Sequence, residues 1–166
     1  MNRATKFTAM AWGAILGISS MSHGFFETLQ GNTPTNALFI TAIGETHQMS
    51  EHGSEPAFTI IPNFLVTGLT AILVGLALII WSIRFLDRRH GATILLLLFI
   101  LSVLVGGGIA QVLIFPAVWA VATRINKPLT WWRKVLPENL LDTLASIWPW
   151  LLGVSSLLFL TTLAVV

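Results

Sequence analysis

Four long apolar stretches alternate with polar connections along this chain of 166 residues. The stretches cover about residues 7–26, 63–83, 92–123 and 147–166. A helix needs about 20 apolar residues to cross the hydrocarbon of a bilayer, and an uncharged run beyond about 18 already indicates a transmembrane helix. The pattern therefore predicts an all-α, polytopic membrane bundle of about four transmembrane helices, built as a single integral membrane domain over residues 1–166.

The third stretch is the longest, and no charged residue occurs between Gly91 and Thr123. As one helix it would measure about 50 Å, against a hydrocarbon core of about 30 Å. Glycine and proline both weaken a helix, and this stretch contains Gly106–Gly108 and Pro116. Two interpretations follow: the helix crosses straight and projects beyond the bilayer, or the chain turns back at the triple glycine as a re-entrant hairpin.

The positions of the basic residues predict the orientation in the membrane. Arg3 and Lys6 precede the first stretch, whereas residues 27–57 contain no Lys or Arg. Cytoplasmic connections carry an excess of basic residues, so the N-terminus is expected inside the cell, and after four straight crossings the C-terminus is inside too. We favour the straight crossing, because a re-entrant glycine turn would need protein cover at membrane depth. The straight crossing leaves the basic connection, residues 124–134, outside the cell.

A small extracytoplasmic cap of helix and loop follows from that choice. The first connection carries four acidic residues, Glu27, Glu45, Glu51 and Glu55, and the third carries four basic ones. Acids and bases from the two connections would meet outside the membrane, although exposed ion pairs add little stability. Residues 36–49 are expected to contribute a short interfacial helix to this cap.

Composition supports a lipid environment and excludes several functional classes. The chain is 55% hydrophobic and only 10% charged, whereas a soluble domain has about a quarter of its residues charged. Its nine basic residues flank apolar stretches, so they indicate topology rather than nucleic-acid binding. With no cysteine there is no thiolate metal site and no catalytic cysteine. We expect a multi-pass protein of a prokaryotic cytoplasmic membrane, with the first stretch retained rather than cleaved as a signal peptide.

The outer connection and its flanks contain candidate metal ligands. His23 and Glu27 are one helical turn apart, on one face of the first predicted helix. Together with Glu45, His47 and His52 they offer nitrogen and oxygen donors of the kind that zinc or iron binds. A solvated acidic loop is the simpler alternative, since no HExxH motif is present.

Two polar residues in the apolar stretches are candidates for a polar path. Asn63 begins the second stretch and Gln111 lies inside the third. Hydrogen bonding between helices is the alternative explanation for both side chains. No catalytic residue is assigned from the sequence, and the identity of any cofactor stays unknown.

Small residues recur at every fourth position, a spacing that lets membrane helices approach closely. They form three ridges: Ala9, Gly13 and Gly17; Thr67, Ala71 and Gly75; and Ser102, Gly106 and Ala110. We interpret the chain as a non-enzymatic accessory or interaction subunit, with the lipid bilayer around it and a membrane protein or a second copy as partner. The alternatives are a carrier or channel for a small or lipid-like molecule and a metal-dependent membrane enzyme.

Overall fold

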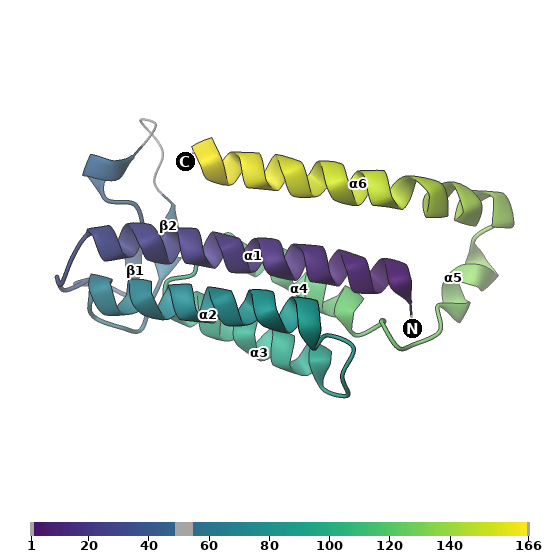
Figure 1. The fold of residues 1–166 in the computed structure, drawn as a ribbon, viewed down its shortest axis with the longest axis horizontal. Coiled ribbons are helices and arrows are strands. Elements are labelled where there is room, and N and C mark those ends of the chain that lie inside the picture. The colour runs from purple at the N-terminus through teal and green to yellow at the C-terminus, as the bar shows by residue number, and fades with distance from the viewer. Residues whose placement is uncertain (1, 49–54, 166) are drawn as a thin grey trace.

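The computed structural model describes residues 2–48 and 55–165. In chain order its elements are α1 (Arg3–Leu29), β1 (Phe39–Thr41), the 3₁₀ turn η1 (Glu45–His47), β2 (Pro56–Phe58), α2 (Phe64–Arg84), α3 (Gly91–Leu104), α4 (Gln111–Ala122), α5 (Thr130–Val135) and α6 (Glu138–Val165). The fold is mostly helical, at 70% helix, as the apolar pattern predicts (Figure 1). Among the described residues, two helices, α2 and α6, are by length and composition able to cross a membrane.

Helices α1 and α2 run antiparallel and pack closely through glycines. Gly17 faces Gly75, and Gly24 faces Gly68. A Cβ atom added to Gly24 or to Gly68 would lie 2.5 Å from the carbonyl oxygen of the other residue, closer than real atoms approach. The two small-residue ridges predicted on α1 and α2 therefore serve this internal contact, whereas the third, Ser102, Gly106 and Ala110, is interrupted by the end of α3 at Leu104.

The third apolar stretch forms two antiparallel helices, α3 and α4, and the chain reverses between them (Figure 1). The backbone N–H of Asn2 donates to the carbonyl of Ile125 at 2.7 Å, so the chain leaving α4 returns to the start of α1. Gly106 and Gly108 make the reversal with φ angles of +96° and +94°, which side chains disfavour. This corrects the expectation of one straight helix over residues 92–123.

Strand β2 supplies the cover that the reversal needs. One edge of β2 pairs antiparallel with β1, and the other edge binds the glycine loop, residues 105–110. The N–H of Gly106 donates to the carbonyl of Phe58 at 3.0 Å, and the N–H of Ile109 donates to the carbonyl of Pro56 at 3.2 Å. Backbone polar groups away from water require such partners, so the glycine loop can lie inside an apolar bundle.

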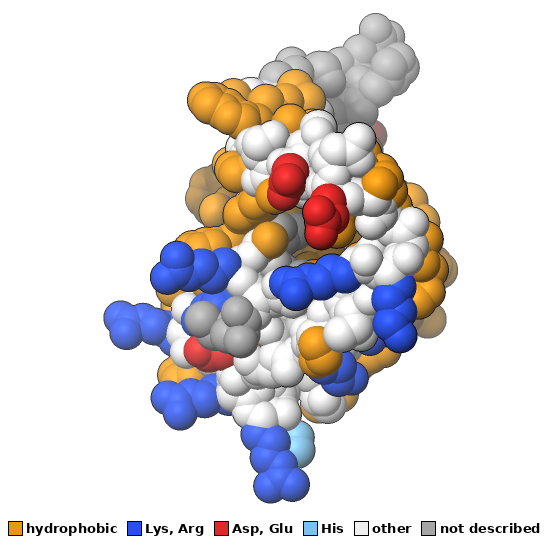
Figure 2. Space-filling view, turned by 90° about the vertical axis from the view of Figure 1, so that its right-hand side faces the viewer, with side chains coloured by type: hydrophobic (Ala, Val, Ile, Leu, Met, Phe, Trp, Pro, Cys, Tyr) orange, Lys and Arg blue, Asp and Glu red, His pale blue; other side chains and the backbone are white. Residues whose placement is uncertain are grey.

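The reversal brings the three segments that carry the nine Lys and Arg residues to one end of the bundle, the basic end (Figure 2). Lys6 of α1 forms an ion pair of 3.0 Å with Asp87 in the α2–α3 turn. The Asn126 side chain donates to the Asp87 carbonyl, and the Asn2 side chain donates to the carbonyl of Lys127. Segments distant in the sequence are thus tied together there.

The first connection lies at the opposite end of α1, a helix of about 40 Å at its 27 residues. The side chain of Gln30, at the end of α1, donates to the carbonyl of Ala42 at 2.8 Å, shortly before Glu45. The predicted cap of paired acids and bases is therefore not formed by the described residues. Within the segment expected as an interfacial helix, residues 36–49, the structure has β1 and η1 instead.

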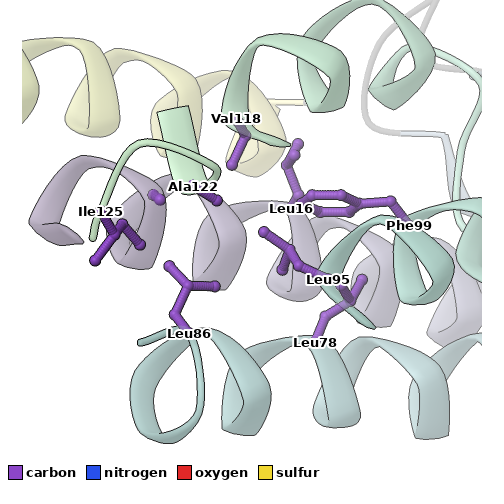
Figure 3. Packing of buried hydrophobic residues seen from close by; sticks show 9 residues of the cluster. Leu16, Leu78, Leu86, Leu95, Phe99, Val118, Ala122 and Ile125 are labelled. Carbon is purple, nitrogen blue, oxygen red and sulfur yellow. The ribbon is translucent and has the colours of Figure 1, made fainter. Parts of the chain in front are cut away.

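Apolar side chains fill the centre of the four-helix arrangement of α1 to α4 (Figure 3). Leu16, Leu78, Leu95 and Phe99 are fully buried there. The ring of Phe115 from α4 stacks on Phe99 with centroids 5.5 Å apart. This core lies between the basic end and the glycine loop.

Helix α6 lies along the outside of this core bundle, parallel to α1 (Figure 1). Phe159 contacts Trp12 of α1 edge-on, with ring centroids 5.5 Å apart. None of the apolar window of α6 is buried, compared with 33% of the corresponding window of α2. The two ends of the chain lie at opposite ends of the molecule in Figure 1.

The glycine contact between α1 and α2 predicts the effect of adding one methyl group. We expect Gly24→Ala to lower the free energy of unfolding by about 1–3 kcal/mol, because the methyl group must push α1 away from the Gly68 carbonyl. Equilibrium unfolding in detergent micelles measures this change. The control is Gly153→Ala on α6, where the added Cβ meets no atom within 4 Å. Equal stabilities of the two variants would contradict the prediction.

Candidate functional site

A cluster of polar side chains is buried beneath the glycine loop, among helices that are otherwise apolar. Ser20, His23 and Glu27 come from α1, Ser102 from α3 and Gln111 from α4. All five are at most 5% exposed, and Glu27 is completely buried. We call these five residues the buried polar cluster.

The glycine loop lies directly on the α1 face that carries His23 and Glu27. A Cβ atom at Gly106 would lie 2.5 Å from both carboxyl oxygens of Glu27. One at Gly108 would lie 2.8 Å from Nε2 of His23. The positive φ angles favour glycine at both positions, and an added Cβ atom would also force the Glu27 carboxyl or the His23 ring to shift.

Hydrogen bonds within the cluster join the helices to one another. The hydroxyl of Ser102 donates to the hydroxyl of Ser20 at 3.0 Å, and Ser20 donates to the carbonyl of Ala71 on α2 at 3.1 Å. The side-chain amide of Gln111 donates to the carbonyl of Gly107 in the glycine loop. The two serine bonds join α3 to α1 and α2, and the Gln111 bond holds the start of α4 to the glycine loop.

His23 is linked to the outer surface through Glu55, which directly precedes β2. Nε2 of His23 lies 2.7 Å from Oε2 of Glu55, and the Glu55 side chain is 33% exposed. The hydrogen bond from His23 lowers the pKa of the Glu55 carboxyl, although partial burial opposes that shift. The sequence offered little sign of this partnership, because residues 23 and 55 meet only when β2 docks on the glycine loop.

Several atoms of the cluster have no hydrogen-bond partner among the described residues. They are both carboxyl oxygens of Glu27, Nδ1 of His23 and Oε1 of Gln111. Leaving a buried polar group unpaired costs about 1–3 kcal/mol, and a buried unpaired charge costs more. Such atoms are expected where a site binds something that the polypeptide alone does not supply.

The structure distributes the five predicted metal ligands over different places. His23 and Glu27 belong to the buried polar cluster, whereas Glu45 and His47 lie in η1. His52 lies outside the described residues, as does the neighbouring Glu51. Within residues 2–48 and 55–165, no group of three or more His, Asp or Glu side chains could hold a metal ion.

The two residues predicted to line a polar path have separate surroundings. Asn63 caps α2 by accepting the N–H of Val66 at 3.1 Å, and its amide donates to Asn32 at 2.8 Å. Gln111 lies in the buried polar cluster, on the glycine loop. The structure thus gives Asn63 a capping role, whereas Gln111 binds the same glycine loop that lies on His23 and Glu27.

The pair of His23 and Glu55 predicts how stability depends on pH. A carboxyl whose pKa is lowered by folding stabilises the folded state above its ordinary pKa of 4.5, and this contribution is lost as the pH falls through the lowered value. We therefore expect a loss of stability below about pH 4.5 that Glu55→Gln reduces. At neutral pH that variant should also be less stable by about 1–3 kcal/mol, because the buried His23 loses its charged partner.

Thermal unfolding in detergent at a series of pH values, from about pH 3 to about pH 8, spans the ordinary pKa of a carboxyl group and measures both effects. Glu45→Gln is the matched control, since Glu45 is an exposed glutamate in η1. An unchanged acid profile in Glu55→Gln would count against the pair.

In comparisons with known proteins, the chain matches no protein-family model, no curated protein and no solved structure. The functional argument therefore depends on the geometry described above. Three features enter it: the basic end, the exposed helix α6 and the buried polar cluster.

Proposed function

We propose that this chain is a small multi-pass integral membrane protein that acts as a non-enzymatic accessory subunit, with its basic end in the cytoplasm. The observation that carries the proposal is the gathering of all nine Lys and Arg residues at one end of an apolar helical bundle. An excess of basic residues marks the cytoplasmic side of membrane proteins. The opposite end carries the first connection, which contains no Lys or Arg.

The outward faces of the helices support lipid as the surrounding solvent. Leu73 of α2 and Leu97 of α3 are 66% and 58% exposed, and further Leu, Ile and Val side chains on these helices are exposed beside them. Contiguous apolar surface of this kind is rare on soluble monomers and typical of a surface that lipid or protein covers. The basic end is the exception, with its charged side chains around a cleft of about 850 Å³ (Figure 2).

The reversal at the glycine loop changes the topology that we propose. In this arrangement α1 and α2 cross the membrane, and α3 and α4 enter from the cytoplasmic side and return to it. With 14 and 12 residues, α3 and α4 measure about 21 and 18 Å, less than the hydrocarbon thickness of about 30 Å. Helix α6 then crosses alone, which puts the C-terminal end outside.

Helix α6 is the surface that we propose for a partner. Its apolar side chains have few contacts within the chain, and Trp150, Val154 and Leu157 are 77%, 56% and 63% exposed. They line a groove of about 450 Å³ with Pro149 and Gly153. A small residue beside large ones lets a second helix approach closely, so a transmembrane helix of another membrane protein is the occupant that fits this groove.

Labelling of single cysteines tests the topology, and the natural chain has no cysteine to interfere. We expect cysteines at Arg88 and Lys127 to react with an impermeant maleimide from the same side of the membrane, and a cysteine at Thr46 to react from the other side. Inside-out and right-side-out vesicles provide the two orientations. Labelling of positions 46 and 127 from one side would overturn the proposed orientation.

Photo-crosslinking in native membranes tests the accessory role. A crosslinking amino acid in place of Leu157 on α6 should capture a protein, whereas one in place of Leu73 on α2 should capture mainly lipid. The two leucines are similarly exposed, at 63% and 66%, so exposure alone cannot produce the difference. Capture of a second copy of this chain would indicate a homo-oligomer, and capture of lipid alone from both positions would refute the proposal.

A further inference from the structure

The burial of the Glu27 carboxyl group costs free energy that no contact within the described chain offsets. The group is completely buried, and neither oxygen accepts a hydrogen bond from any described residue. A carboxylate cannot remain charged in such a place without a compensating positive charge. It must therefore carry either a proton or a bound cation.

Among the described residues, the charged and titratable groups around Glu27 supply no such compensation. On α1 its neighbour is His23, whose Nε2 is occupied by Glu55 beside β2. The glycine loop, α3 and α4 contain no charged residue, and the one charge in α2 is Arg84 at the basic end. No Lys or Arg occurs between residues 27 and 83.

The surroundings favour a proton over a metal cation. Cations such as Na⁺ or Ca²⁺ are held by several converging oxygen ligands, but the described residues contain no cluster of three or more acidic or histidine side chains. The hydroxyls of Ser20 and Ser102 are directed to each other and to the Ala71 carbonyl. A proton needs only the one carboxyl group.

Among the described residues, the partly exposed Glu55 connects the buried polar cluster to the surface. From Glu27 and His23, the partly exposed Glu55 leads to the end that holds the first connection. Toward the basic end, α1 continues from Ser20 to Leu16, which is packed with Leu95 and Phe99, all fully buried (Figure 3). Protons can thus reach the cluster through His23 and Glu55, while the apolar core blocks the way to the basic end.

We propose that Glu27 is a proton-binding site inside the bundle, reached through Glu55 and His23 from the end that holds the first connection. This inference goes beyond the accessory role and does not depend on it. The site takes up and releases protons on one side, as a sensor does, and does not conduct them across the membrane. Beneath the glycine loop, the carboxyl of Glu27 is neutral.

Reaction with dicyclohexylcarbodiimide tests the site, because this apolar reagent modifies protonated carboxyl groups in apolar surroundings. We expect the purified full chain in detergent to acquire one adduct, located at Glu27 by peptide mass spectrometry. The rate should fall about tenfold for each pH unit once the carboxyl ionises. Glu27→Gln should lose the adduct, and Glu45→Gln, with an exposed glutamate replaced, should keep it.

Two results would overturn the proposal. The first is the absence of an adduct at Glu27 in the unmodified chain, a measurement that needs no variant to fold. The second is slower labelling when sodium replaces choline at constant pH, which would show that Glu27 binds a metal cation instead. Infrared spectra of the unmodified chain provide a second measurement, since a protonated carboxyl absorbs where a carboxylate does not. The accessory role is tested separately: an absence of protein crosslinks from α6 would change neither the adduct at Glu27 nor its response to sodium.

Discussion

The need of buried backbone groups for hydrogen-bond partners governs the arrangement of this chain. A run of three glycines can reverse inside an apolar bundle only if its N–H and carbonyl groups are paired. Strand β2 pairs the N–H groups of Gly106 and Ile109, the Ser102 carbonyl and the Gln111 side chain pair Gly107, and α1 presents a face on which the loop fits without side chains. The antiparallel α3 and α4, the common position of the basic segments and the burial of His23 all follow from this one contact.

The same contact explains why polar groups occur at this depth. Ser20, Ser102 and Gln111 are used to hold the loop and its helices together, which is an ordinary role for small polar side chains between membrane helices. Glu27 differs, because it adds nothing to that network while it bears the full cost of burial. Groups retained at such a cost within membranes are by default candidates for function.

Local pattern predicted the helical class of the fold and the close packing of the first two helices, since hydrophobic runs and small-residue spacing are properties of single segments. The pattern marks Gly106–Gly108 as a weak point in a helix. It nevertheless favours the straight helix, because no local feature of the sequence indicates which segment would cover a turn there. That cover comes from β2, a strand of three residues whose pairing joins positions about fifty residues apart. His23 and Glu27 were singled out from their helical spacing, whereas the link to Glu55 depends on the same distant pairing and could not be predicted.

The docking of β2 on the glycine loop also constrains how the polypeptide is assembled during synthesis. In the proposed orientation, the first connection would already lie across the membrane when α3 and α4 leave the translocation machinery, because chains emerge from the ribosome in order. The hairpin of α3 and α4 would then dock on β2, and the backbone groups at its tip would be paired instead of facing lipid. Shortening the first connection would therefore impair the insertion of a segment that lies far downstream of the deletion.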